Sequence, residues 1–510
     1  MSQAESETPS SAATPVATGL RDGVALAVAK FGAALLAFVA QGALLRVTSE
    51  QDFGRYSTFL IVSNLAIAFT VWPCSSVLRL GSNEWVKTHR LARTYWLHLL
   101  LVLGAAAILA TPLWEARDVV DRYVTVPGAT KIVLAYALIT AVATVSGAIL
   151  KPAGKVLSFA ILPVLSRIFY VGAFGWLALQ RRTLDAREMM LICVATAIPQ
   201  LVAAIFLAAR HVLPPARLDA EEANVALRFG LPVLFRMLGG QSFAYVNAIY
   251  IKRAEGLVAM SRISIASNLA EQTALLAGAF EDLVGPILAR SAAEGKERVL
   301  RTYYALVAPQ VALAWSTACG VAILLAFTIL QLLRAKSLEA SGITFQILLL
   351  ATTVRIVVSL ESPVFDAHLI SAPPLAFFAL GFATNLGLDV VLVPRFGIQG
   401  AAWASVAGWT VNALLRSGYL GWRFRVPSPL VFLYLLPAGA AFVYARTLGG
   451  RLVVDLGAAA ALVAGSLLVG RLTRVFSPAA FHALEGVRMP QKVRRLLAWF
   501  YGAPPDGAQA

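Results

Sequence analysis

Apolar runs of about twenty residues recur along this chain from Val24 to Leu472, separated by short polar connections. Each run is long enough to cross the roughly 30 Å hydrocarbon layer of a bilayer as a helix. Only helices and closed barrels satisfy their own backbone hydrogen bonds in lipid, and a barrel would show alternating segments of roughly ten residues. With 59% hydrophobic and only 14% charged residues, the chain is predicted to be a polytopic α-helical membrane protein.

The apolar runs predict fourteen transmembrane helices, each able to cover the bilayer core with some tilt. Their expected bounds are 24–45, 54–72, 95–114, 131–150, 157–179, 188–208, 229–250, 261–286, 304–330, 342–362, 372–393, 398–420, 428–445 and 452–473. Pro73 breaks the end of the second run, and the eighth run is unusually polar.

Lysine and arginine residues in the connections set the expected orientation. With the N-terminus in the cytoplasm, more of the 43 lysines and arginines fall on the cytoplasmic side, as the positive-inside rule requires. We therefore expect a multi-pass protein of the bacterial inner membrane with both termini in the cytoplasm. The net charge of +16 then reflects topology-setting loops, so we expect no nucleic-acid partner.

Self-similarity indicates two halves. The first span opens with LRDG at 20–23 and the seventh with LRFG at 227–230, and copies six spans apart have the same orientation. This predicts an all-α fold of two pseudo-symmetric six-helix halves plus two C-terminal helices. The expected segments are a disordered cytoplasmic tail (1–22), an N-terminal half (23–210), a C-terminal half (225–425), helices 13 and 14 (426–473) and a basic amphipathic cytoplasmic tail (474–510). Chance similarity is the alternative explanation of the repeat.

Four cations lie inside apolar runs, where they are costly: Lys30, Arg167, Arg236 and Arg355. A Lys or Arg at the bilayer centre costs about 2.5–3.5 kcal/mol on insertion scales. This cost is accounted for if the four side chains line an interior cavity that holds an anion. They are therefore the predicted substrate-binding residues.

The two halves share a pattern of one cation and one amide. Lys30 and Gln41 in the first span have the same spacing as Arg236 and Asn247 in the seventh. Because a helical residue advances by about 100°, the members of each pair lie roughly 20° apart around the helix, three turns from each other. Gln41 and Asn247 are therefore predicted to line the cavity together with the cations.

The eighth span carries a polar stripe at helical spacing, made of Ser264, Asn268, Glu271 and Asp282. A polar face on a spanning helix faces a cavity or another helix, so Ser264 and Asn268 are predicted to line the cavity. Glu271, Asp282 and Asp389 are candidates for coupling transport to an ion. The alternatives are structural ion pairs, of Arg167 with Glu271 or Asp389, and of Glu271 with Arg167 or Arg236.

Motifs for catalysis, nucleotide binding and metal binding are missing from the sequence. It contains no Walker A loop and no HExxH, GxSxG or paired CxxC motif. Three cysteines lie far apart, in or beside apolar runs: Cys74, Cys193 and Cys319. This placement indicates buried thiols and no disulfide framework. We expect no enzymatic activity, no cofactor and no metal site.

Four segments resemble Wzx-type polysaccharide flippases. QDFGRYS at 51–57 is similar to the segment after their first helix, and FGLP at 229–232 to the start of their seventh. PILAR at 286–290, with the EGKE that follows, is similar to one of their loops, and VPRFGIQGAA at 393–402 to the start of their twelfth helix. The resemblance covers nearly the whole chain in the family's order. It implies a fourteen-helix, MATE-like member of the multidrug/oligosaccharidyl-lipid/polysaccharide exporter superfamily.

Such proteins move undecaprenyl-pyrophosphate-linked oligosaccharides across the inner membrane by alternating access, for O-antigen, exopolysaccharide and lipopolysaccharide biosynthesis. The resemblance therefore implies that the partners are this lipid-linked glycan and membrane lipids. A polymerase and a chain-length regulator of the same pathway are further candidate partners. Cations suit this substrate because they replace water around its pyrophosphate.

Two alternatives stay open. A cation-coupled multidrug exporter of the same superfamily would be expected to use a membrane carboxylate, whereas the first span offers Lys30. A membrane enzyme of polysaccharide assembly would be expected to carry paired carboxylates on a large outer loop, and the connections here are short.

Overall fold

The computed structural model describes residues 15–180, 182–293, 297–333, 341–368, 370, 372–473, 475–476 and 501. Most of the predicted tails at 1–22 and 474–510 lie outside these ranges. The backbones of Lys30, Arg236 and Asp282 are helical, but their side chains also lie outside the described part of the structure.

The described residues are almost entirely helical, and their only β pairing is a single bridge between Thr48 and Leu184. The elements before residue 213 are α1 (Pro15–Val47), α2 (Glu50–Val71), η1 (Trp72–Ser76), α3 (Val77–Thr88), α4 (Ala92–Glu115), α5 (Arg117–Val124), α6 (Ala129–Ala148), α7 (Val156–Leu179) and α8 (Ala186–Val212). Those after it are α9 (Ala220–Glu255), α10 (Leu257–Ala293), α11 (Glu297–Thr302), η2 (Tyr303–Val307), α12 (Ala308–Leu324), α13 (Ala326–Leu332), α14 (Gly342–Ala367), α15 (Ala372–Phe424), η4 (Ser428–Leu435), α16 (Leu436–Thr447) and α17 (Leu452–Leu472).

All-helical, multi-pass architecture is confirmed. Ten helices within the described ranges are long and apolar enough to cross a membrane. One of them, α15, has a non-helical residue at Gly397 and contains two predicted spans, 372–393 and 398–420. The remaining predicted spans coincide with α1, α9 and α10. Within α1, residues Phe31–Val47 form a shorter apolar stretch.

Local sequence explains where several helices begin and end. Ser49 caps α2 by accepting a hydrogen bond from the backbone N of Asp52 at 3.1 Å, and Asp185 caps α8 in a reciprocal box with Glu188. Gly256 adopts φ +88° between α9 and α10, and Gly397 adopts φ +56° at the kink of α15. Glycine tolerates these positive φ values because it has no Cβ. These two residues therefore mark sharp changes in chain direction.

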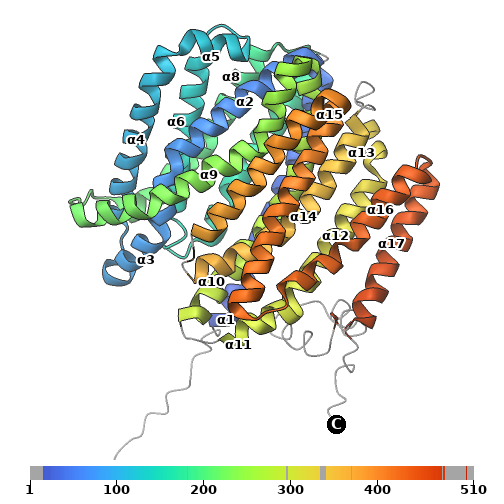
Figure 1. The fold of residues 1–510 in the computed structure, drawn as a ribbon. Coiled ribbons are helices and arrows are strands. Elements are labelled where there is room, and N and C mark those ends of the chain that lie inside the picture. The colour runs from blue at the N-terminus through green and yellow to red at the C-terminus, as the bar shows by residue number, and fades with distance from the viewer. Residues whose placement is uncertain are drawn as a thin grey trace, which may run out of the picture.

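Helix packing follows the same scheme in two sets. In the first set α2, α4 and α8 pack on α6, and α1 packs on α7. In the second set α10, α12 and part of α15 pack on α14, and α9 packs on α15. The sets meet where α1 and α2 contact α10 and where α2 contacts α9, which is what a pseudo-two-fold arrangement gives. Figure 1 shows α4 and α6 on one side of the bundle, and α12, α16 and α17 on the other.

Exposed surface on the spanning helices is rich in large apolar side chains. Trp176 on α7, Phe206 on α8 and Leu472 on α17 are each more than half exposed. Such a surface would be unfavourable in water but suits lipid. Several polar side chains of the bundle instead lie inside, around the cavity described next.

Several contacts between the two sets lie near the turn from α9 into α10. Glu50 of α2 forms an ion pair with Arg262 of α10, with 3.3 Å between Oε2 and Nη2. Lys252 donates to the backbone carbonyl of Tyr123 and lies 3.9 Å from its ring centre. We call this group the α9–α10 junction. A second set of contacts, including a 3.2 Å ion pair between Arg93 and Glu222, ties the start of α9 to α4.

Candidate functional site

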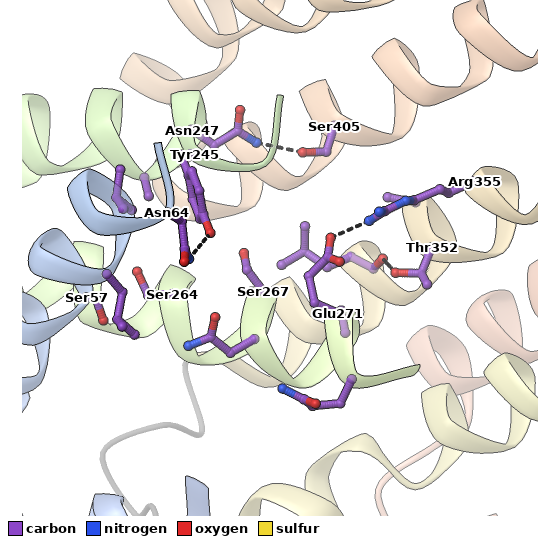
Figure 2. A pocket seen from close by; sticks show the side chains of 18 of the residues that line it. Ser57, Asn64, Tyr245, Asn247, Ser264, Ser267, Glu271, Thr352, Arg355 and Ser405 are labelled. Atoms are coloured by element: carbon purple, nitrogen blue, oxygen red, sulfur yellow. Dashed lines mark hydrogen bonds and ion pairs between the residues drawn. The ribbon is translucent and has the colours of Figure 1, made fainter. Parts of the chain in front are cut away.

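A cavity of about 470 Å³ lies where the two sets of helices meet. Its walls come from α2, α7, α9, α10, α14 and α15, so both sets contribute. Figure 2 shows polar side chains from these helices pointing toward a common space. The structure brings together here six of the residues that the sequence singled out: Arg167, Asn247, Ser264, Asn268, Glu271 and Arg355.

One face of α10 forms a continuous wall of the cavity. Ser264, Ser267, Asn268 and Glu271 recur at helical spacing along it, and Gln272 extends the wall. The stripe faces the cavity because these polar groups would be costly against lipid. Ser264 and Asn268 therefore line this cavity.

Glu271 pairs with Arg355 across the cavity wall. Nη1 of Arg355 donates to Oε1 of Glu271 at 2.5 Å, which links α14 to α10. The guanidinium of Arg355 also lies 5.1 Å from the ring centre of Trp409 on α15, in the geometry of a cation–π contact. The expected structural partners of Glu271 were Arg167 and Arg236. Among the described residues Glu271 instead pairs with Arg355, because α10 packs against α14 and brings the two side chains together.

Arg167 supplies a second cation from the opposite set of helices. It lies on α7 and lines the cavity, and within the described ranges no acidic side chain is within ion-pair distance of it. The suggested pairs with Glu271 and Asp389 therefore do not form among those residues. Tyr56 and Tyr170 lie close by on α2 and α7, with 2.9 Å between their hydroxyl oxygens. Among the described residues, the cavity thus contains one cation with a carboxylate partner and one without.

Asn247 both lines the cavity and ties two helices together. Its Nδ2 atom donates to the carbonyl oxygen of Ala401 at 2.8 Å and to Oγ of Ser405 at 2.6 Å, both on α15. Gln41, its expected counterpart, is not among the residues that line the cavity, and its Nε2 atom is buried without a hydrogen-bond partner in the described part of the chain. The shared spacing did not place the two amides in equivalent surroundings, because spacing does not fix how each helix is rotated toward its neighbours.

Asp389 lies outside the cavity wall on α15, one turn after Asn385, which is also buried. Both residues are fully buried, and the side-chain oxygens of both lack hydrogen-bond partners among the described residues. One turn further along, Val393 packs with Ala401, whose carbonyl accepts from Asn247. Asp389 therefore lies within the layer of α9 and α15 that Asn247 joins.

The structure adds polar cavity residues that the sequence analysis did not name. Nδ2 of Asn64 on α2 donates to the hydroxyl of Tyr245 on α9 at 2.6 Å, across the boundary between the two sets. Ser57, Ser267, Gln272, Ser405 and Trp409 also line the cavity. The signal for them was weak, because single Ser, Asn or Trp residues are common in transmembrane helices and only packing shows which way they face.

Three of the predicted site residues have side chains that are not described. Those of Lys30, Arg236 and Asp282 lie outside the described part of the structure. Met237, which follows Arg236 on α9, lines the cavity. The backbone of Arg236 is therefore adjacent to the site.

No protein-family model and no curated protein matches the sequence. Solved structures do match. The lipid II flippase MurJ in an inward closed conformation has a TM-score of 0.65 at 13% identity, covering 88% of this chain and 99% of that one. An inward-facing multidrug resistance MATE family transporter of the MOP superfamily has a TM-score of 0.61 at 15% identity, covering 78% and 98%. A mutant MATE transporter from Vibrio cholerae, VcmN, has a TM-score of 0.56 at 15% identity, covering 79% and 98%.

At these identities the likeness shows the fold alone. The chain therefore has the fold of MOP-superfamily transporters and flippases, spanning nearly the full length of these three structures. This confirms the MATE-like fold class, while the substrate has to be argued from the cavity.

Proposed function

We propose that this protein is an inner-membrane flippase for undecaprenyl-pyrophosphate-linked oligosaccharides. The observation that carries the proposal is the pair of cations Arg167 and Arg355, which reach one polar cavity from opposite sets of helices. A lipid pyrophosphate loses hydration when it crosses the membrane, and guanidinium groups replace that water with charge-assisted hydrogen bonds. The transporter fold and the Wzx-like sequence segments support the same function.

The rest of the cavity suits a sugar. Its wall carries neutral hydrogen-bonding groups, including Asn64, Asn268 and Gln272, beside the aromatic rings of Tyr245 and Trp409. Sugar hydroxyls can both donate to and accept from such groups, and a sugar ring can pack on an aromatic face. The prenyl tail would stay in the lipid that surrounds the apolar exterior. Transport would thus move only the polar head group through protein.

Alternating access requires the two sets of helices to part at each membrane surface in turn. With both termini in the cytoplasm, as loop charge predicts, the α9–α10 junction faces away from the cytoplasm. Its contacts, including the ion pair of Glu50 with Arg262, would then close the outer end of the transport path. A polymerase and a chain-length regulator on the outer side are the proposed consumers of the released glycan.

Asp389 is the coupling residue that the geometry favours. Glu271 has Arg355 as a counter-ion, whereas Asp389 is buried and has no hydrogen-bond partner among the described residues. A buried carboxylate in this state is costly unless it takes up a proton or a cation. Uptake and release at Asp389 would supply the energy for one step of the cycle.

A cation-coupled multidrug exporter is the second candidate, because the same buried Asp389 and the MATE-like fold would serve it equally. Deletion of the gene in its own host separates the two functions. We expect loss of surface polysaccharide, accumulation of the lipid-linked oligosaccharide on the cytoplasmic side, and rescue by the wild-type gene. Normal polysaccharide together with raised sensitivity to cationic drugs would overturn the flippase proposal.

Arg167→Gln is the variant that tests the site itself. Because a hydrogen bond to a charged group contributes about 1.5–3 kcal/mol, we expect export to fall at least about tenfold. Arg167→Lys keeps the charge and should retain more activity. Full export by a stably inserted Arg167→Gln protein would contradict a role for this cation.

A further inference from the structure

We propose that Glu271 is an exchangeable counter-ion of Arg355, which the phosphate of an anionic lipid displaces on binding. Between transport events the carboxylate of Glu271 then binds Arg355 at the position that the substrate's phosphate takes when it binds. The inference rests on the proposed function and deepens it, because it states how the cavity selects anionic head groups.

The ion pair is accessible from the cavity. Its two side chains are 34% exposed for Arg355 and 47% exposed for Glu271, although both belong to helices of the bundle. Both side chains line the cavity, and Figure 2 shows their contact beside the other cavity side chains. A ligand in the cavity could therefore reach the pair directly. A fully buried pair would need the helices to separate before its partners could change.

Arg355 is held more firmly than Glu271. Its guanidinium lies over the ring of Trp409 at 5.1 Å while it donates to Glu271. For Glu271, the ion pair with Arg355 is its only hydrogen bond within the described ranges. When a ligand enters, the carboxylate can therefore swing away while the arginine stays in position.

The exchange favours a phosphate over the carboxylate. Solvent-accessible ion pairs contribute little, because water screens them and ordering two long side chains opposes them. A pyrophosphate carries more negative charge than a carboxylate and offers several oxygens to the forked donors of arginine. A neutral lipid has nothing with which to replace Glu271. The pair therefore admits anionic head groups and keeps Arg355 compensated when none is bound.

Arg167 provides the contrast within the same cavity. It has no acidic partner among the described residues, so it can attract an anion without first losing a counter-ion. Removing the carboxylate of Glu271 should therefore strengthen anion binding only through Arg355. This dependence separates exchange from a general change in the charge of the cavity.

Farnesyl pyrophosphate, a short lipid pyrophosphate, is the probe, and its binding to the purified full-length protein is measured by calorimetry. We expect Glu271→Gln to tighten binding about 2- to 5-fold, the range that an exposed ion pair can contribute. In an Arg355→Gln background, Glu271→Gln should have no effect on binding of the probe. Farnesol, which lacks the pyrophosphate, should not bind more tightly after Glu271→Gln in either background. Glu188→Gln is the matched control, since Glu188 forms a 2.5 Å ion pair with Arg182 outside the cavity.

Unchanged or weaker binding by a folded Glu271→Gln protein would overturn the exchange, as would equal tightening in the Arg355→Gln background. If Glu271→Gln does not fold, Glu271→Asp serves instead. Its shorter side chain is a poorer competitor and should give a smaller gain that again depends on Arg355. Failure of the proposed function looks different, because the wild-type protein would then not bind the probe and Arg167→Gln would leave export unchanged.

Discussion

Arg355 and Glu271, which lie on α14 and α10, form an ion pair of 2.5 Å that opens onto the cavity between the two sets of helices. From the sequence alone, Arg355 was predicted to bind the substrate and Glu271 to couple transport to an ion. Their pairing joins the roles, since whatever binds Arg355 also changes the surroundings of Glu271. Among the described residues, Arg167 then remains as the cavity cation that has no acidic partner.

The repeat predicts that Lys30 and Arg236 act alike. Charge is what a pyrophosphate needs, so Lys30→Arg should retain more export than Lys30→Ala. Arg236→Ala should reduce export to a similar extent as Lys30→Ala. The measurement is surface polysaccharide in a deletion strain that carries each variant, with membrane insertion checked by immunoblot. Normal export by both inserted alanine variants would remove these two cations from the site.

Substitution of Asp389 by Asn should uncouple transport. The neutral amide cannot take up and release a proton or cation, so transport should lose most of its dependence on the ion gradient. The assay is lipid flipping in proteoliposomes with imposed gradients of protons or sodium. Asp455→Asn is the control, because Asp455 is also buried but lies on α17, outside the two sets. An unchanged gradient dependence in Asp389→Asn would rule out this residue.

Gly54 tests the closure at the α9–α10 junction. A Cβ at this position would collide with the backbone carbonyl of Leu257, so Gly54→Ala should wedge α2 away from α10. We expect less time in the closed state and slower transport, seen as faster thiol labelling of a reporter cysteine introduced at Ser57 in the cavity wall. Gly104→Ala is the matched control, because nothing lies within 4 Å of its added Cβ. Equal labelling of both variants would show that this contact does not limit opening.

The pH dependence of stability should include a contribution from Asp121, outside the membrane spans. Burial raises the pKa of its carboxyl, but hydrogen bonds from Thr130 and from the backbone N of Gly128 outweigh this and lower the pKa overall. A lowered pKa stabilises the fold above the unfolded value of about 3.9, and this contribution is lost as the pH falls through the folded value. Asp121→Asn should thus melt below the wild type at pH 7, and the gap should shrink below about pH 4. A gap that does not change with pH would contradict this.

Topology is tested by reporter fusions after Arg21, Arg182 and Arg495. Loop charge predicts cytoplasmic reporters after the first and third positions and an extracytoplasmic one after the second. Alkaline phosphatase and green fluorescent protein give opposite signals at each site. A cytoplasmic signal after Arg182 would invert the orientation, and with it the assignment of the α9–α10 junction to the outer side.

Parts of the site could be predicted because they follow from one helix alone. Ser264, Asn268 and Glu271 share a face by helical periodicity, and the cost of polar groups in lipid turns that face inward. Gln41 shows the limit of the same reasoning. Its spacing from Lys30 matches that of Asn247 from Arg236, yet only Asn247 reaches the cavity. Periodicity gives the angle between residues on one helix, whereas the rotation of that helix depends on its neighbours.

By itself the sequence determined the membrane class, the positions of the spans and the all-helical fold, because each helix in lipid must be apolar over its length and satisfy its own backbone. Only the tertiary structure decided which polar groups meet. Glu271 pairs with Arg355 of its own set rather than with Arg167 of the other set. Asn64 of α2 meets Tyr245 of α9, and Asp389 is buried away from the cavity. These contacts join helices far apart in the chain, and their partners are selected by helix packing, which no local pattern encodes.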